Sequence, residues 1–544
     1  MADAMPTPPP AASAAPARRL LAALALACAA VPAGGAQAAP LQLADALAQA
    51  LARHPGIAVQ RSEIDAAAAR LQQARGRFDW LSAAGVHHER TVRPLGDSAL
   101  VPPDGLTQSR LIATGYQAEV SRLLAQGARV GAGLAATGND NLAPGAARVQ
   151  QKLLELRLDV TQPLLRGRGS AAGAAAAEEA ARLELVASRY ALRERAAQTI
   201  YSVLTAYWTY RARLELEQVA ASSAQRSTAL LASIQQLVDA GERPRADMVL
   251  LRADAADKEA ALAAAALSRS EARDALGRLL GADAAAIAAL AEPAEALPDP
   301  LQHTLPEALP APRLAAWRSA ARARRPDVQV LAWQREAALR QLAAARNAQL
   351  PQLDLQAGLG YAKVMEGGRH YGFLDQGGRV QSGPSVYARL NWEFPLQNNS
   401  ARGAAAERAA QLAQLDIRQR DLDTAVATEI DGAARALQAS QAQLRSAREG
   451  LAWYELAVSQ EITKQKNGIA TLIDVINVES RYVSARVTAL QLQLACAEAL
   501  ARLRLATGTL LAGGPSAAAE PDRYSLDPAA LAGLGPLALA PPPD

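Results

Sequence analysis

Apolar residues recur at alternating steps of three and four along residues 467–508. Two such series run through this stretch: Ile473, Ile476, Ser480, Val483, Val487, Leu490, Leu494, Ala497 and Ala501 in the first, and Val475, Val478, Tyr482, Ala485, Ala489, Leu492, Cys496, Ala499 and Leu503 in the second. The spacing predicts a long helix of the coiled-coil kind. Because an offset of two residues is about 200° around a helix, we expect neighbours on two opposite sides.

A polar row separates the two series. Its members are Asp474, Asn477, Arg481, Ser484, Thr488, Gln491, Glu498 and Arg502, and only Ala495 interrupts it. A helix with two apolar seams and a polar row between them suits a wall that has water on one face. Several such helices can close into a tube.

Helical periodicity also covers much of the remaining chain. It runs through residues 41–77, with one break at His54 and Pro55, and through residues 246–280. The longest stretch, residues 171–240, contains no proline and corresponds to about 105 Å of helix. A helix of that length does not fit a compact domain, so we expect an elongated protein.

Two regions, residues 78–162 and 352–394, change to a period of two. In the segment LLELRLDV of the first region, leucine and valine alternate with charged residues. This pattern predicts strands with one apolar and one charged face, and their lengths suit strands that cross a membrane between lipid and water. The first region is longer than the second, and residues 116–124 and 127–136 form a candidate hairpin in it.

The order of elements occurs twice. Four pairs of segments correspond: residues 54–59 and 325–330, 162–164 and 394–396, 241–247 and 468–474, and Gly281 and Gly508. Each half therefore reads as helix, strands, long helix, turn and helix. We expect a first structural repeat at 39–281, a linker or equatorial segment at 282–310, a second repeat at 311–508, and a disordered Ala-, Gly- and Pro-rich tail at 509–544.

The first 38 residues have the pattern of an export signal. Two arginines precede an apolar run at residues 20–31, and a small-x-small cleavage site follows at 36–38. The run is too short to cross a hydrocarbon core of about 30 Å as a helix, so we expect a signal peptide and not an anchor. Cys28 fits a lipoprotein cleavage box only loosely, which leaves lipidation as an alternative.

Composition argues against several classes of function. The net charge is only +4 over 544 residues, and basic residues do not cluster, so we expect no nucleic-acid partner. The five histidines show no ligand spacing with cysteine, and no Ser, His and acid grouping stands out. We therefore expect no metal, no cofactor and no enzyme activity. Cys496 would be the single cysteine after removal of the leader, so no disulfide is expected within the chain.

Strands in lipid must close into a barrel, because lipid offers no partner to an open edge. Two to four strands in each half are too few, so we expect several chains to share one barrel with a helical tube below it. In its duplicated plan, its HP and RP helix starts, its QPLL and FPLQ strand ends and its segment NGIATLIDVINVESRYVSA, the chain resembles the TolC-like outer-membrane efflux channel family over residues 41–510.

The resemblance implies a fold that is mainly α, with a transmembrane β-barrel part. It implies a homotrimer in which each chain gives four strands to a 12-stranded barrel, in contact with the lipid of the outer membrane of a Gram-negative bacterium. A long α-barrel would lie in the periplasm and would dock to a periplasmic adaptor (membrane fusion) protein and an inner-membrane transporter. The extra length of the first strand region is either a long external loop or additional strands, and additional strands would change the count of 12.

The resemblance also assigns pore-gate positions to Asp474 and Asn477, with Asp247 as the equivalent in the first half. Asn477 departs from the acidic pattern of the family. Three copies of Asp474 at a constriction would attract cations and raise one another's pKa. The alternative is that Asp474 is a helix-start carboxylate favoured by the helix dipole.

The two turns between the long helices would form tips that meet the adaptor. Their residues are Gly241, Glu242, Arg243 and Arg245 in the first, and Gly468, Ala470 and Thr471 in the second. The glycines can also be explained as left-handed helix caps. A basic position that locks the closed pore in the family falls on Ala470, which leaves that lock absent or rebuilt from Arg243 or Arg245.

These features predict the outer-membrane channel of a tripartite efflux or export system, a passive gated conduit. A channel of type I protein secretion is the alternative within the same class, since the pump and adaptor would select the cargo. A periplasmic coiled-coil adaptor or structural protein is the alternative from another class.

Overall fold

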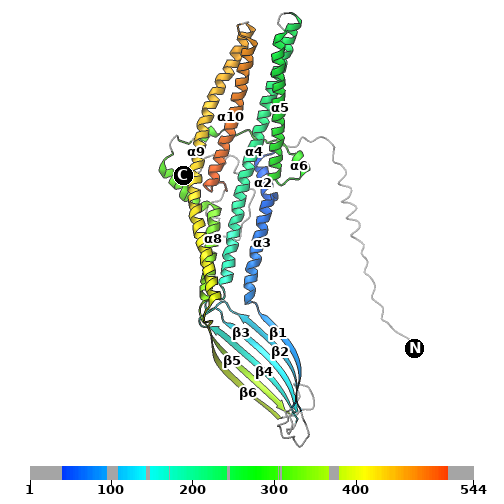
Figure 1. Cartoon of the computed structure of the whole chain (residues 1–544), viewed down its shortest axis with the longest axis vertical. Helices are drawn as coiled ribbons and strands as arrows, with labels where there is room; N and C mark the ends of the chain where they lie inside the picture. Colours follow the sequence, from blue (N-terminus) through cyan, green and yellow to red (C-terminus); the bar gives the residue numbers. More distant parts are fainter. Residues whose placement is uncertain are drawn as a thin grey trace, which may run out of the picture.

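The structure is a computed structural model that describes residues 40–94, 108–142, 148–170, 172–241, 245–303, 305–306, 309–366, 379–467 and 469–511. The expected signal peptide, Cys28, the tip residues Glu242, Arg243 and Gly468, and the tail beyond residue 511 lie outside these residues. The described chain is elongated, with long helices over most of its length and one antiparallel sheet at one end (Figure 1).

The helices and strands follow the same order in the two halves. The first half contains α2 (Leu43–Arg53), α3 (Pro55–Arg75), the 3₁₀ turn η1 (Gly76–Phe78), β1 (Leu81–Pro94), β2 (Gln108–Leu123), β3 (Arg129–Leu142), β4 (Val149–Pro163), α4 (Ala176–Asp239) and α5 (Ala246–Leu279). The connecting segment contains α6 (Ala284–Ala288) and η2 (Pro300–His303). The second half contains α7 (Ala311–Arg324), α8 (Pro326–Asn347), β5 (Gln352–Glu366), β6 (Arg379–Glu393), α9 (Asn399–Lys466) and α10 (Leu472–Ala506).

The helices form two hairpins, α4 with α5 and α9 with α10, which extend from the middle of the molecule to the end opposite the sheet (Figure 1). On the sheet side of the middle, α3 packs on α4 and α8 packs on both α4 and α9. Four helices, α3, α4, α8 and α9, therefore form the wall that leads to the strands (Figure 1). Among the described helices, none is both long enough and apolar enough to cross a membrane.

The two seams predicted on the last helix are confirmed. Leu490 and Leu494 of the first seam pack against the buried cluster that includes α2 and α4. Cys496 and Leu503 of the second seam belong to the cluster that includes α7 and α9. The polar row between them faces outward, and only Glu498 in it is partly buried. The helix thus has a neighbour on each side and a solvent-exposed polar face, as the spacing predicted.

The segment between α5 and α7 ties the two halves together at the middle of the molecule. Leu297 is buried in the cluster of the first half, and Leu305 is buried in the cluster of the second. Gln441 of α9 accepts a hydrogen bond from the backbone N of Leu305 at 3.0 Å. Gln493 of α10 donates to the carbonyl of Pro298 at 2.8 Å. We call this segment, residues 280–310, the belt.

All six described strands form one sheet in sequence order, β1 to β6, and every neighbouring pair is antiparallel. The four strands per chain that the family resemblance implied are therefore wrong for this chain. The candidate hairpin is real and appears as β2 and β3, which are longer than the segments that the alternation marked. Adding a hairpin keeps every strand antiparallel to its neighbours, so the sheet accommodates it without any change of topology.

The register gives the sheet one apolar and one polar face. Leu156 of β4 lies between Leu134 of β3 and Tyr361 of β5 in one row of partners. Large apolar side chains on this face are exposed, with 76% for Val386 and 66% for Trp392, and further examples are Val86, Tyr116, Leu134, Leu156, Leu158, Leu359 and Leu390. The opposite face carries Gln117, Glu119, Glu155, Arg157, Asp159, Gln356, Arg389 and Asn391. An exposed apolar face of this extent suits contact with lipid.

Candidate functional site

The tip of the second hairpin is closed by a capping box at the start of α10. The Oγ1 and backbone N of Thr471 donate to Oδ2 of Asp474 at 2.6 and 2.9 Å, and the backbone N of Asp474 donates to Oγ1 of Thr471 at 3.3 Å. The side-chain and backbone hydrogen bonds from Thr471 hold the pKa of Asp474 below its usual range. The helix-start reading of Asp474 is therefore confirmed within a single chain.

The remaining gate positions lie at the same end of the molecule. Asn477 is exposed one turn beyond Asp474 on α10. Asp247 lies in the first turn of α5, on the tip of the other hairpin. A gate formed by these residues needs further copies of the chain, so it stays a prediction.

The first tip ends α4 with a left-handed glycine. Gly241 has a φ of 78°, and its backbone N donates to the carbonyl of Val238 at 3.1 Å. Glycine adopts this conformation without steric cost. Arg245 follows as the residue before α5, is exposed, and makes no side-chain cap for that helix. The capping role of Gly241 is thus confirmed, and its adaptor-docking role stays a prediction.

The structure brings the two tips together through a small apolar cluster. Leu472, at the start of α10, packs with Ile234 of α4 and with Met248 and Leu251 of α5. Leu251 is fully buried, and Leu472 and Met248 nearly so. The beginning of α10 is therefore held against the α4–α5 hairpin by side chains that sequence spacing did not single out.

An ion pair joins the two hairpins just below this cluster. The Nε of Arg226 on α4 lies 2.7 Å from Oε1 of Glu479 on α10. The Arg226 side chain is 45% exposed, so we expect the pair to contribute less than about 1 kcal/mol. The sequence could not reveal it, because the two residues are 253 positions apart. Ala470, to which the resemblance assigns the lock of the closed pore, carries no charge, so the lock stays a prediction.

Apolar side chains are exposed at both tips. Ile469 is 75% exposed and Ile473 is 54% exposed on the second tip, and Val249 is 72% exposed on the first. Exposed aliphatic residues gathered at one end of a molecule are typical of a surface that binds another protein.

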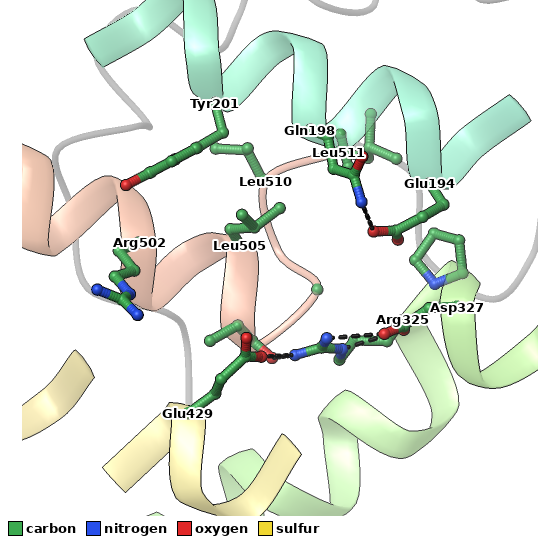
Figure 2. Close-up of a pocket in the computed structure, with 14 residues that line it drawn as sticks. Glu194, Gln198, Tyr201, Arg325, Asp327, Glu429, Arg502, Leu505, Leu510 and Leu511 are labelled. Atoms are coloured by element: carbon green, nitrogen blue, oxygen red, sulfur yellow. Dashed lines mark hydrogen bonds and ion pairs between the residues drawn. The ribbon is translucent and has the colours of Figure 1, made fainter. Parts of the chain in front are cut away.

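A pocket lies at the middle of the molecule, between α4, α8, α9 and the end of α10 (Figure 2). Arg325 donates to Glu429 at 2.6 Å, to Asp327 at 2.7 Å and to the carbonyl of Ala506 at 3.2 Å. Burial opposes the charge of Arg325, but the hydrogen bonds to these two carboxylates raise its pKa. Burial raises the pKa of the Glu194 carboxyl, which accepts a hydrogen bond from Gln198 at 2.7 Å.

The charged groups of this pocket are used to hold helices together. Arg325 joins the start of α8 to α9 and to the end of α10 (Figure 2). Among the residues that line the pocket there is no serine, cysteine or histidine nucleophile. We therefore interpret it as a joint between helices. Elsewhere in the described chain, no group of three or more His, Cys, Asp or Glu side chains is placed to hold a metal ion.

A comparison with protein-family models matches residues 317–509 to the outer membrane efflux protein family. A comparison with curated proteins gives no match. Several solved structures share the fold. VceC, an outer membrane protein of Vibrio cholerae, is 18% identical, with coverage of 86% of this chain and 96% of that chain and a TM-score of 0.58.

Two further structures share the fold. The CmeC outer membrane channel of Campylobacter jejuni is 14% identical, with 86% and 85% of the two chains covered and a TM-score of 0.61. A membrane protein of Pseudomonas aeruginosa is 17% identical, with 86% and 90% covered and a TM-score of 0.62. The fold, mainly helical with one antiparallel sheet, is thus shared with solved outer-membrane channels.

The family model and the fold together confirm the resemblance to the TolC-like outer-membrane efflux channel family. The match and the shared fold agree with the expected outer-membrane location. The sheet, with its exposed apolar face, is the part that suits the membrane.

Proposed function

We propose that this protein is the outer-membrane channel of a tripartite export system. It acts as a homotrimeric, passive and gated conduit from the periplasm to the exterior. A periplasmic adaptor couples it to an inner-membrane transporter, which supplies the energy. The observation that carries this proposal is the continuity of the chain from an amphipathic sheet, with lipid and water faces, into long helices that end in two exposed tips.

The gate in this proposal lies at the tips. Three copies of Asp474, with Asn477 one turn further along, form the constriction, and Asp247 supports it from the first hairpin. The capping box supports this role because it holds the carboxylate in one position at the start of α10. In the trimer, repulsion between the three carboxylates opposes the effect of Thr471 on the pKa of Asp474.

The tips also bind the adaptor in this proposal. Gly241, Arg245, Ala470 and Thr471 lie there among the exposed side chains Ile469, Ile473 and Val249. Binding would bury these apolar residues, and it would act on the start of α10 directly. A docking event at the tip can therefore shift the gate without a long path of coupling.

The function is tested by single-channel conductance of the purified full chain in a planar bilayer. We expect a small, cation-selective conductance that rises several-fold and loses selectivity in Asp474→Ala. Asp283→Ala is the matched control, because Asp283 also caps a helix start, accepting from the backbone N of Ala286 at 2.8 Å, but lies at α6. Thr471→Ala removes the cap and keeps the charge, so cation selectivity should persist.

The outcomes separate the channel from its gate. An unchanged conductance in Asp474→Ala would place the gate elsewhere and leave the channel standing. Failure to insert into the bilayer would contradict the channel itself and favour a periplasmic coiled-coil protein. The lipid-facing sheet argues against that class, since a periplasmic adaptor has no use for it.

A further inference from the structure

The sheet ends in two open edges. Among the described strands, β1 pairs only with β2, and β6 pairs only with β5. Unpaired backbone groups cannot remain in lipid, because each costs several kcal/mol there. β1 leads away from the helices and β6 leads back to them (Figure 1), so β6 of one copy and β1 of the next meet as antiparallel strands. Their apolar faces then coincide.

The number of strands matches the width of the helical wall. Four helices, α3, α4, α8 and α9, occupy about 32–40 Å of circumference at the usual spacing of 8–10 Å. Six strands spaced by about 4.8 Å and tilted by about 40° occupy about 38 Å. Four strands would occupy only about 25 Å. The additional hairpin therefore gives the sheet the same arc as the helices above it.

The register within the sheet agrees with closure. Following the pairs from strand to strand, Leu81 at the start of β1 shares a row with Tyr387 of β6. β6 continues beyond that row for six residues, to Glu393. If β6 pairs over its whole length with β1 of the next copy, every copy adds the same offset of six residues along the strands. This offset corresponds to a strand tilt of about 35°. Transmembrane barrels have tilts of this size.

We propose that three copies join β6 to β1 and close an 18-stranded barrel whose bore is as wide as the helical tube. This inference rests on the proposed channel function and its trimer. At six strands per copy the backbone diameter is about 36 Å, against about 24 Å for twelve strands. Barrels of 16–18 strands leave a water-filled channel. A barrel of this width suits bulkier cargo than a 12-stranded barrel would pass.

Cysteine cross-linking tests the edge contact. Complete overlap places Ala84 of β1 opposite Leu390 of β6 on the apolar face, and a shift of two residues places Ala84 opposite Trp392. In a Cys496→Ala background, oxidation of Ala84→Cys with Leu390→Cys, or with Trp392→Cys, should give covalent dimers and trimers. The matched control, Ala83→Cys with Leu390→Cys, places the two thiols on opposite faces of the sheet and should give none.

The result that overturns this inference differs from failure of the channel. Cross-linked species that stop at dimers, or twelve strands counted by electron microscopy of the protein in nanodiscs, exclude the 18-stranded barrel. Either result in a protein that still inserts and conducts leaves the proposed function intact. Eighteen strands with covalent trimers would support both.

Discussion

The turn at His54, just before α3, and the turn at Arg325, just before α8, occupy equivalent places in the two halves, and we call them the first and second corner. Different interactions hold the two corners. At the first corner, Nδ1 of His54 accepts a hydrogen bond from the backbone N of Gly56 at 3.0 Å. At the second corner, Arg325 makes ion pairs with Asp327 and Glu429. In both, proline occupies the first position of the helix that follows. The shared proline sets the geometry, and the polar residue before it can change.

The strand regions differ in another way. The first half contributes four strands to the sheet and the second contributes two. The helices around them nevertheless keep the same order and similar lengths, as with α5 and α10 at 34 and 35 residues. A strand hairpin can therefore be added to one half without disturbing the helical plan. Four experiments test how far the two halves are equivalent.

The largest difference should appear at the corners. Arg325→Ala leaves two carboxylates without their partner at a site where the arginine side chain is 13% exposed, and we expect a loss of about 2–3 kcal/mol. His54→Ala removes one cap and should cost about 1 kcal/mol. Thermal unfolding followed by circular dichroism compares them. The control is Arg322→Ala, whose exposed pair with Asp423 should contribute little.

The free-energy cost of replacing the glycines that end α5 and α10 should differ by a smaller amount. Gly281 and Gly508 have φ angles of 68° and 70°, so alanine at either position costs about 1–2 kcal/mol. A Cβ on Gly281 would also lie 2.6 Å from the carbonyl O of Arg53, whereas on Gly508 the nearest atom is at 3.1 Å. Gly281→Ala should therefore be the more destabilising variant. Gly432→Ala, inside α9 with open space around it, should be neutral or stabilising.

The two tips should differ in how firmly the following helix begins. Thr471→Ala removes the capping box of α10 and should cost about 1 kcal/mol of local stability. Arg245→Ala should have no such effect, because Arg245 makes no side-chain cap for α5. Hydrogen exchange of the first turns of α10 and α5 measures both. Equal exchange of α10 in wild type and Thr471→Ala would show that apolar packing of Leu472 holds the tip.

The smallest effect should be a dependence on pH at the first corner alone. Burial, and then the charge of Arg195, lower the pKa of His54. His54 therefore binds a proton less readily in the folded chain than in the unfolded chain. Its contribution to the free energy of unfolding is complete above about pH 6.5 and is lost as the pH falls toward the lowered pKa of the folded chain. His54→Asn can still cap the helix and should remove this part of the pH dependence. An unchanged pH profile in the variant would assign it to other groups.

The elements with strong local periodicity could be predicted from the sequence. The stretch at 246–280 became α5 almost residue for residue, and the alternating segment LLELRLDV became the centre of β4. The helix-start alternative for Asp474 could also be predicted, because it depends only on residues close to Asp474 in the sequence. These signals work because helix and strand periods act over a few neighbouring residues.

The contacts between halves could not be predicted in this way. Arg226 and Glu479 belong to helices of different repeats, and neither spacing nor charge pattern links them. The packing of Leu472 on Met248 also depends on how the hairpins lean on each other. The full strand count needed the pairing of β1 with β2, because β1 mixes histidine, arginine and glycine and alternates weakly.

The belt holds α10 far from the tip of the hairpin. Gln493 fixes α10 to the belt, and Leu472 at the tip is 21 residues away, which makes a lever of about 32 Å. A rotation of about 10° at the belt would then displace the tip by about 5–6 Å, the length of one helical turn. A small rotation of α10 about its contact with the belt would therefore be amplified, by the length of the helix alone, into a displacement at the tip of about one helical turn.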